Sequence, residues 1–180
     1  SQRDAPAGWA PTLWLDPGAV RAMVGESEAA LSQADAENAD TYRRNGDDLT
    51  ARLITLEAGT QTALLPYQAI PFFTFHESFG YFDNRFGLDN HGAISISPDR
   101  QPGAQRLKEI RSELAEHDRV CVFSEPQFPP KLVDIVVEGT AARTGTLDPL
   151  GAALEPGSAL YFSLIEQNRD AFTTCFQDTM

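Results

Sequence analysis

Four short predicted strands alternate with segments of helical periodicity, and this alternation limits the folds open to the chain. The predicted strands occupy 71–75, 92–96, 119–123 and 141–146, and the helical patterns occupy 78–86, 103–116, 129–138 and 158–176. Strand–helix units in succession predict a parallel sheet with helices on both faces. The run RVCVF at 119–123 is nearly continuous in apolar residues, as in a strand that is covered on both sides. We therefore expect an α/β fold with a four-stranded, mainly parallel sheet.

Helical sequence precedes these units. Residues 17–34 start with Pro17 directly after Asp16, a combination typical of a helix N-terminus. Residues 36–57 keep helical spacing, interrupted only by Gly46, and predict a long helix ahead of the sheet. The expected organisation is a polar segment at 1–16, a helical segment at 17–60 and a single α/β lobe at 61–180.

The charge of the chain excludes some partners. With 26 acidic and 14 basic residues, the formal net charge is -12, which leaves no broad basic surface for nucleic acid. No run of eighteen apolar residues is present, so we expect no membrane span. The start SQRDAPAGWAPT lacks the pattern of a signal peptide, and an exported chain would therefore be a processed one.

The sequence contains two cysteines, Cys121 in a predicted strand and Cys175 in the last predicted helix. One interpretation is a pair of separate buried thiols. The other is a disulfide that joins the last helix to the sheet, which would indicate an oxidising compartment such as the periplasm.

Polar residues follow each predicted strand, at the edge where open α/β sheets bind ligands. They are His76 and Glu77, Ser97 and Asp99, Ser124 and Glu125, and Thr146 and Asp148. A histidine that converges with several carboxylates would suit zinc or manganese. Each candidate also has a structural interpretation, His76 as a hydrogen-bonded helix start and Glu125 and Asp148 as N-cap or turn residues.

The other two histidines are interpreted as structural, His91 as a turn residue and His117 as a helix end. Enzyme signatures are absent: the chain has no P-loop, no GxGxxG after a strand, no GxSxG, no HExxH and no CxxC pair. We therefore expect no enzymatic activity.

Four motifs carry a family resemblance: FHESFGYFDNRFGL, SISPDRQPGAQRLKEIRSEL, CVFSEPQF and GTLDPLG. In this order and at these spacings they resemble the C-terminal half of the periplasmic zinc-binding proteins of bacterial zinc-uptake ABC transporters. The segment LWLDP at 13–17 resembles the part of that family which leads into a long inter-lobe helix. The resemblance covers almost the whole chain after residue 12.

The resemblance implies a ligand set. It gives His76 as a metal ligand and Asp148 as a candidate second ligand, with zinc preferred to manganese. It also implies a disulfide between Cys121 and Cys175. Where the family has a histidine just before LWLDP, this chain has Thr12, and the family's first lobe has no counterpart here. Because a closed zinc site usually needs four ligands, the lobe alone would bind zinc weakly.

Two functions follow from the resemblance. The first is a zinc-binding periplasmic component truncated to the C-terminal lobe, with the zinc ion and an ABC transporter permease as partners. A homodimer is a further expectation, because a lobe without its partner lobe would expose an apolar face. The alternative is a degenerate half-protein that no longer binds metal tightly and acts as an interaction module.

Overall fold

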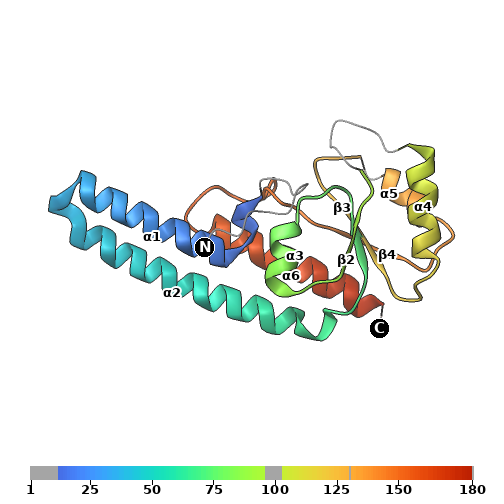
Figure 1. Ribbon diagram of the computed structural model, residues 1–180, viewed down its shortest axis with the longest axis horizontal. Helices are drawn as coiled ribbons and strands as arrows, with labels where there is room; N and C mark the ends of the chain where they lie inside the picture. Colours follow the sequence, from blue (N-terminus) through green and yellow to red (C-terminus); the bar gives the residue numbers. More distant parts are fainter. Residues whose placement is uncertain (1–11, 96–102, 130, 180) are drawn as a thin grey trace.

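The computed structural model describes residues 12–95, 103–129 and 131–179, and it shows six α-helices and four strands in those ranges (Figure 1). The helices are α1 (Pro17–Ala34), α2 (Ala39–Leu64), α3 (Gly80–Phe86), α4 (Ala104–Leu114), α5 (Lys131–Val137) and α6 (Leu160–Asp178). The strands are β1 (Phe72–Thr74), β2 (Asn90–Ala93), β3 (Cys121–Ser124) and β4 (Arg143–Thr146). Short 3-10 turns lie at Leu13–Leu15, Ala36–Asn38 and Leu65–Tyr67.

The four strands form one sheet in the order β2-β1-β3-β4, and every neighbouring pair is parallel. This confirms the expected α/β fold. Because the strands are parallel, the loops after β1, β3 and β4 leave the sheet at the same edge and in neighbouring positions. These three loops contain His76, Glu125 and Asp148.

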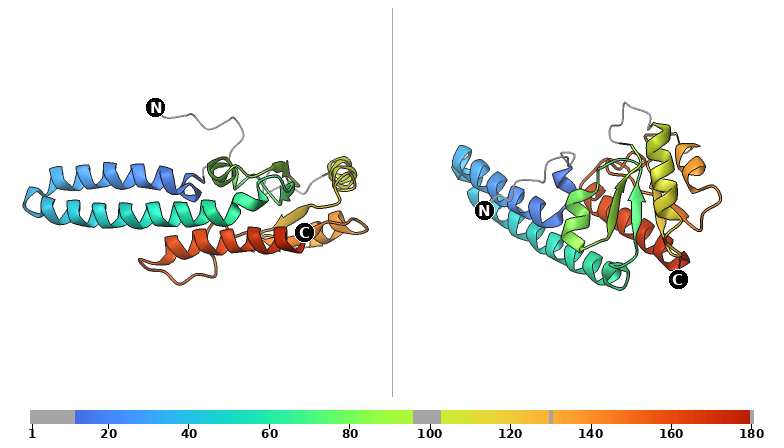
Figure 2. Two further views of the ribbon diagram at one scale, coloured as in Figure 1. Left: turned by 90° about the horizontal axis from the view of Figure 1, so that it is seen from below. Right: turned by 45° about the vertical axis from the view of Figure 1, so that its right-hand side comes forward.

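Helices cover both faces of the sheet (Figure 2). On one face Phe72 and Phe123 pack against Phe172 and Phe176 of α6, and the rings of Phe72 and Phe172 meet edge to face at 5.2 Å. On the other face the apolar side chains of β1 and β3 pack against α4 and α5. This second cluster is made of Phe73, Phe75, Ile94, Ile110, Leu114, Val120, Val122, Val133 and Val136. Both faces are therefore apolar, which explains the continuous apolar run at 119–123.

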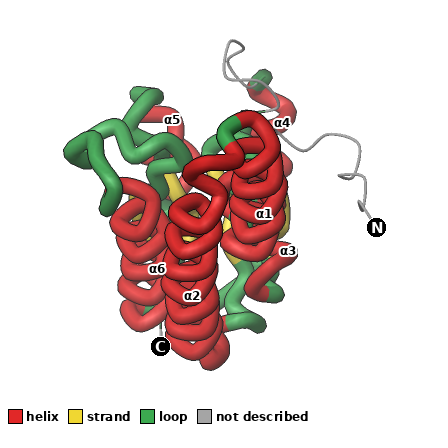
Figure 3. Tube along the Cα trace, turned by 90° about the vertical axis from the view of Figure 1, so that its left-hand side faces the viewer, coloured by secondary structure: helices red, strands yellow, loops and turns green. Residues whose placement is uncertain are grey.

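The helices α1 and α2 form a hairpin that projects beyond the lobe, and α2 lies between α1 and α6 (Figure 3). Helix α1 begins where predicted, with the Asp16 side chain accepting a hydrogen bond from Gly18 N. Helix α2 continues to Leu64, beyond the predicted end at residue 57. The extension is stabilised by tertiary packing, because Thr60 and Leu64 are fully buried.

The disulfide between Cys121 and Cys175 is present, so the interpretation as separate thiols is wrong. It joins β3 to α6, with the two Cα atoms 6.3 Å apart. The interpretation of His91 as a turn residue is also wrong, since β2 begins at Asn90 and includes it. Pairing of Phe72 with Asn90 adds these residues to the sheet although their polar sequence NH does not predict a strand.

None of the helices within the described ranges is long and apolar enough to cross a membrane.

Candidate metal centre

Sheet register brings His76 and Glu125 together. Thr74 of β1 pairs with Phe123 of β3, and each residue of interest follows two positions later. The His76 Nδ1 atom lies 2.5 Å from Glu125 Oε1. The Ser78 hydroxyl also donates to Glu125 Oε1, at 3.2 Å. The two adjacent parallel strands therefore place an imidazole against a buried carboxylate at their carboxyl ends.

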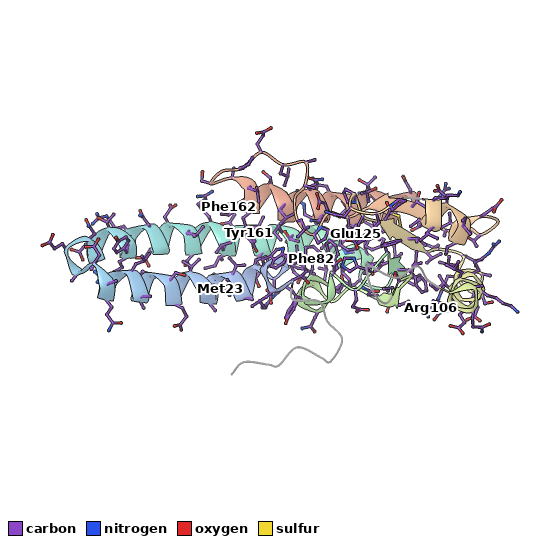
Figure 4. All side chains as sticks on the ribbon, turned by 90° about the horizontal axis from the view of Figure 1, so that it is seen from above. Met23, Phe82, Arg106, Glu125, Tyr161 and Phe162 are labelled. Atoms are coloured by element: carbon purple, nitrogen blue, oxygen red, sulfur yellow. A yellow bond between two sulfur atoms is a disulfide. The ribbon has the colours of Figure 1, made fainter. Side chains whose placement is uncertain are left out.

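This contact determines how the imidazole can act. In the tautomer in which a neutral imidazole donates from Nδ1 to the carboxylate, Nε2 keeps its lone pair. A carboxylate on the second ring nitrogen is the usual support of a metal-binding histidine. The Glu125 side chain is 2% exposed, and within the described part of the chain its Oε2 atom has no hydrogen-bond partner. Figure 4 places Glu125 within the lobe rather than on the projecting hairpin. Glu125 thus orients His76.

Asp148 lies in the loop after β4 and is 3% exposed. Its Oδ1 atom accepts hydrogen bonds from Gln127 Nε2 at 2.9 Å and from the backbone N–H groups of Leu150 and Gly151 at 3.0 Å each. Its Oδ2 atom accepts one from Ala152 N at 2.6 Å. The carboxylate therefore caps its own loop, and Oδ1 accepts more of these hydrogen bonds than Oδ2.

The pKa of Asp148 is lowered from its ordinary value. Burial alone would raise this pKa, but the hydrogen bonds from Gln127 and from the three loop amides favour the ionised form more strongly. The backbone of Asp148 is also held, because Asn168 of α6 accepts from its N–H and donates to its carbonyl oxygen, each at 2.8 Å. Asp148 is therefore a fixed, ionised carboxylate at the same edge of the sheet as His76.

Among the described residues, the other polar ones that follow the predicted strands make fewer hydrogen bonds with His76 and Asp148. The hydroxyls of Ser124 and Thr146 contact each other at 3.1 Å, across β3 and β4. The charge of Glu77 acts on buried Asp83 of α3, whose pKa is raised mainly by burial and further by Glu77. Ser97 and Asp99 lie outside the described residues. Throughout 12–95, 103–129 and 131–179, no group of three or more His, Cys, Asp or Glu side chains is arranged to hold a metal ion. Among the described residues, His76 and Asp148 are thus held in fixed positions at one edge of the sheet, without a closed metal site.

Thr12 occupies the position before LWLDP that the resemblance gives to a histidine. It is buried, and its hydroxyl donates to the carbonyl oxygen of Ser78 at 2.5 Å, two residues after His76. The residue at this position therefore lies against the His76 loop. Thr12 offers that loop a hydrogen bond and no imidazole.

Sequence reasoning did not select Gln127, Ser78 or Asn168. Gln127 follows Glu125 by two positions in the loop after β3. This closeness to a candidate residue was the one feature of the sequence that could have indicated a role for Gln127. Ser78 and Asn168 lie on helical patterns, and only the packed structure shows what they contact.

The parallel α/β lobe joined to a long helical hairpin is the fold of ZnuA-type solute-binding proteins. The chain belongs to the ZnuA family, described as the periplasmic component A of the zinc-uptake complex, whose pattern matches residues 3–175. This confirms the resemblance seen in the motifs. The family is one of uptake components, which agrees with the expectation of no enzymatic activity.

Individual relatives agree with this assignment. The chain is 41% identical over 163 residues to the high-affinity zinc uptake system protein ZnuA of Brucella abortus strain 2308, covering 91% of this chain and 49% of the relative. A crystal structure of ZnuA superposes with a TM-score of 0.79 at 26% identity, covering 92% of this chain and 60% of that one. The Zn(II)-bound E280Q variant of AdcAII from Streptococcus pneumoniae gives 0.76 at 26% identity, covering 92% and 60%. The chain spans about half the length of the Brucella relative.

Proposed function

We propose that this chain binds zinc through His76, with Asp148 as a second ligand, as the solute-binding component of a periplasmic zinc-uptake ABC transporter. The observation that carries the proposal is the contact between His76 Nδ1 and Glu125, because it leaves Nε2 free to bind a metal. Membership of the zinc-uptake family supports zinc as the ion and the periplasm as the location. A permease is then the macromolecular partner.

The donor set favours zinc over manganese. Imidazole nitrogen with one carboxylate oxygen suits zinc, whereas manganese prefers a shell richer in oxygen. Asp148 would bind as a monodentate ligand through Oδ2, the oxygen that accepts fewer hydrogen bonds. Water, a second copy of the chain or another protein would supply the remaining ligands, and a homodimer is one arrangement that does so.

The test is calorimetric titration with zinc at neutral pH, with the disulfide intact. The wild type should give a one-site isotherm that His76→Ala abolishes. His91→Ala is the matched control, since it removes an imidazole from the same lobe at a distance from the strand ends, and it should leave the isotherm unchanged. Asp148→Asn should weaken binding about 10-fold or more.

The stoichiometry identifies the source of the missing ligands. One zinc per two chains would support a site at a dimer interface, and one zinc per chain would support water or another protein. Binding that is weak and unaffected by His76→Ala would refute the zinc site and favour the alternative, an interaction module that has lost tight metal binding.

A further inference from the structure

The loop after β3 connects the two proposed ligands. Glu125 contacts His76 on one side of this loop, and Gln127, two residues later, donates to Asp148 on the other side. This arrangement follows from the strand order, since β3 lies between β1 and β4. One short segment therefore holds both ligand-bearing loops.

A second segment, far away in the sequence, makes the same kind of connection. Thr12 Oγ1 donates to the carbonyl oxygen of Ser78 in the His76 loop. Two residues later, Trp14 Nε1 donates to the carbonyl oxygen of Pro149, next to Asp148, at 2.8 Å. The spacing of two residues is the same as in the loop after β3. The two ligand-bearing loops are thus connected twice.

The second segment is itself well anchored. Leu15 is fully buried in the core that contains α6. Asp16 binds Arg85 of α3 through both carboxylate oxygens, at 2.5 and 2.8 Å. Thr12 is buried and the Trp14 ring packs against the same core as Leu15. A segment fixed at both ends can restrain the loops that it touches.

We propose that residues 12–16 form a strap that fixes the spacing of the His76 and Asp148 loops, and that Trp14 is its positioning residue. The inference rests on the proposed zinc site. Trp14 makes no contact with the metal in this role. Its indole N–H holds the Pro149 carbonyl, and the Asp148 carboxylate follows because the two residues are adjacent. Ligands held at a fixed separation bind a metal more tightly than ligands on loops that move independently.

The test uses Trp14→Phe, which keeps an aromatic ring and removes the N–H donor. Tyr161→Phe is the matched control, because within the described chain the buried Tyr161 hydroxyl has no hydrogen-bond partner. The first measurement is amide hydrogen exchange of residues 147–154 in zinc-free protein. We expect exchange there to be several-fold faster in Trp14→Phe and unchanged in Tyr161→Phe.

The second measurement is zinc affinity. Trp14→Phe should weaken zinc binding by up to about 10-fold, the low end of what is lost with a residue that supports a ligand. Because the loop after β3 makes the parallel connection, Gln127→Leu combined with Trp14→Phe should lose more affinity than the product of the two single losses. A purely structural role for Trp14 would give independent effects.

Unchanged exchange in Trp14→Phe would overturn the strap, and so would faster exchange with unchanged zinc affinity. Both results leave the zinc site in place if His76→Ala abolishes binding. Failure of the wild type to bind zinc through His76 would instead overturn the proposed function, and the positioning role with it. Thr12→Val provides a second variant of the strap, expected to speed exchange in the loop at 76–79, should Trp14→Phe fail to fold.

Discussion

Reduction of the disulfide between Cys121 and Cys175 should destabilise the protein without unfolding its lobe at room temperature. The bond closes a loop with a sequence separation of 54 residues. On the chain-entropy account, such a loop stabilises the folded state by about 4 kcal/mol at 25 °C through its restriction of the unfolded chain. For a chain of this length, each kcal/mol corresponds to about 2–4 °C in Tm, so reduction should lower Tm by about 8–16 °C.

The assay is thermal and urea unfolding followed by circular dichroism, with and without a phosphine reductant. The double variant Cys121→Ala/Cys175→Ala is the control, because the reductant should not change its stability. The double variant also measures how much free energy of unfolding is lost when the smaller alanine side chains replace the cysteines, since both cysteines are buried. If the wild type loses less than about 1 kcal/mol on reduction, the restriction of the unfolded chain is not what this bond contributes.

Three further predictions concern buried polar groups. Asp83→Asn should stabilise the protein at neutral pH by about 1–3 kcal/mol in urea unfolding, since burial raises the pKa of Asp83 and ionisation there opposes folding; equal stabilities at neutral pH would contradict this. Asn168→Leu should destabilise by about 2–4 kcal/mol in the same assay, because the N–H and carbonyl of Asp148 both lose a buried partner. Asp148 has a lowered folded pKa, so it contributes stability above its unfolded pKa of about 3.9, and this is lost as the pH falls through the folded value. Stability measured between pH 5 and 2 should therefore fall less steeply in Asp148→Asn than in the wild type.

Most of the fold could be predicted from local patterns. The limits of α1 agree with the predicted helix at 17–34, and each predicted strand has a counterpart. The difference at the end of α2 has a physical cause, because Gly59 and the threonines around it are poor helix formers, and burial of Leu64 outweighs that propensity. The start of β2 at Asn90 and His91 was missed for a similar reason, since pairing with β1 rather than residue preference adds these two residues to the predicted strand.

The candidate site could be predicted only as a set of residues. The positions of His76, Glu125 and Asp148 directly after predicted strands made them candidates. The sequence does not say which strands are neighbours, so it could not predict which of these residues are in contact. Glu125 was expected to be a ligand candidate or a turn residue, and the structure shows that it orients His76. Asp148 has the turn role that the sequence suggested, because its loop folds back to place three amides on the carboxylate.

The sequence alone determined the alternation of strands and helices, the acidic net charge and the motifs of a zinc-uptake family. These properties depend on residue type and on spacing along the chain, so they can be read without coordinates. Only the tertiary structure decided the order β2-β1-β3-β4, the contact of His76 with Glu125 and the position of the strap at residues 12–16. Those features join segments that are far apart in the sequence, and their geometry is set by sheet register and by packing on both faces of the sheet, which local sequence preferences do not specify.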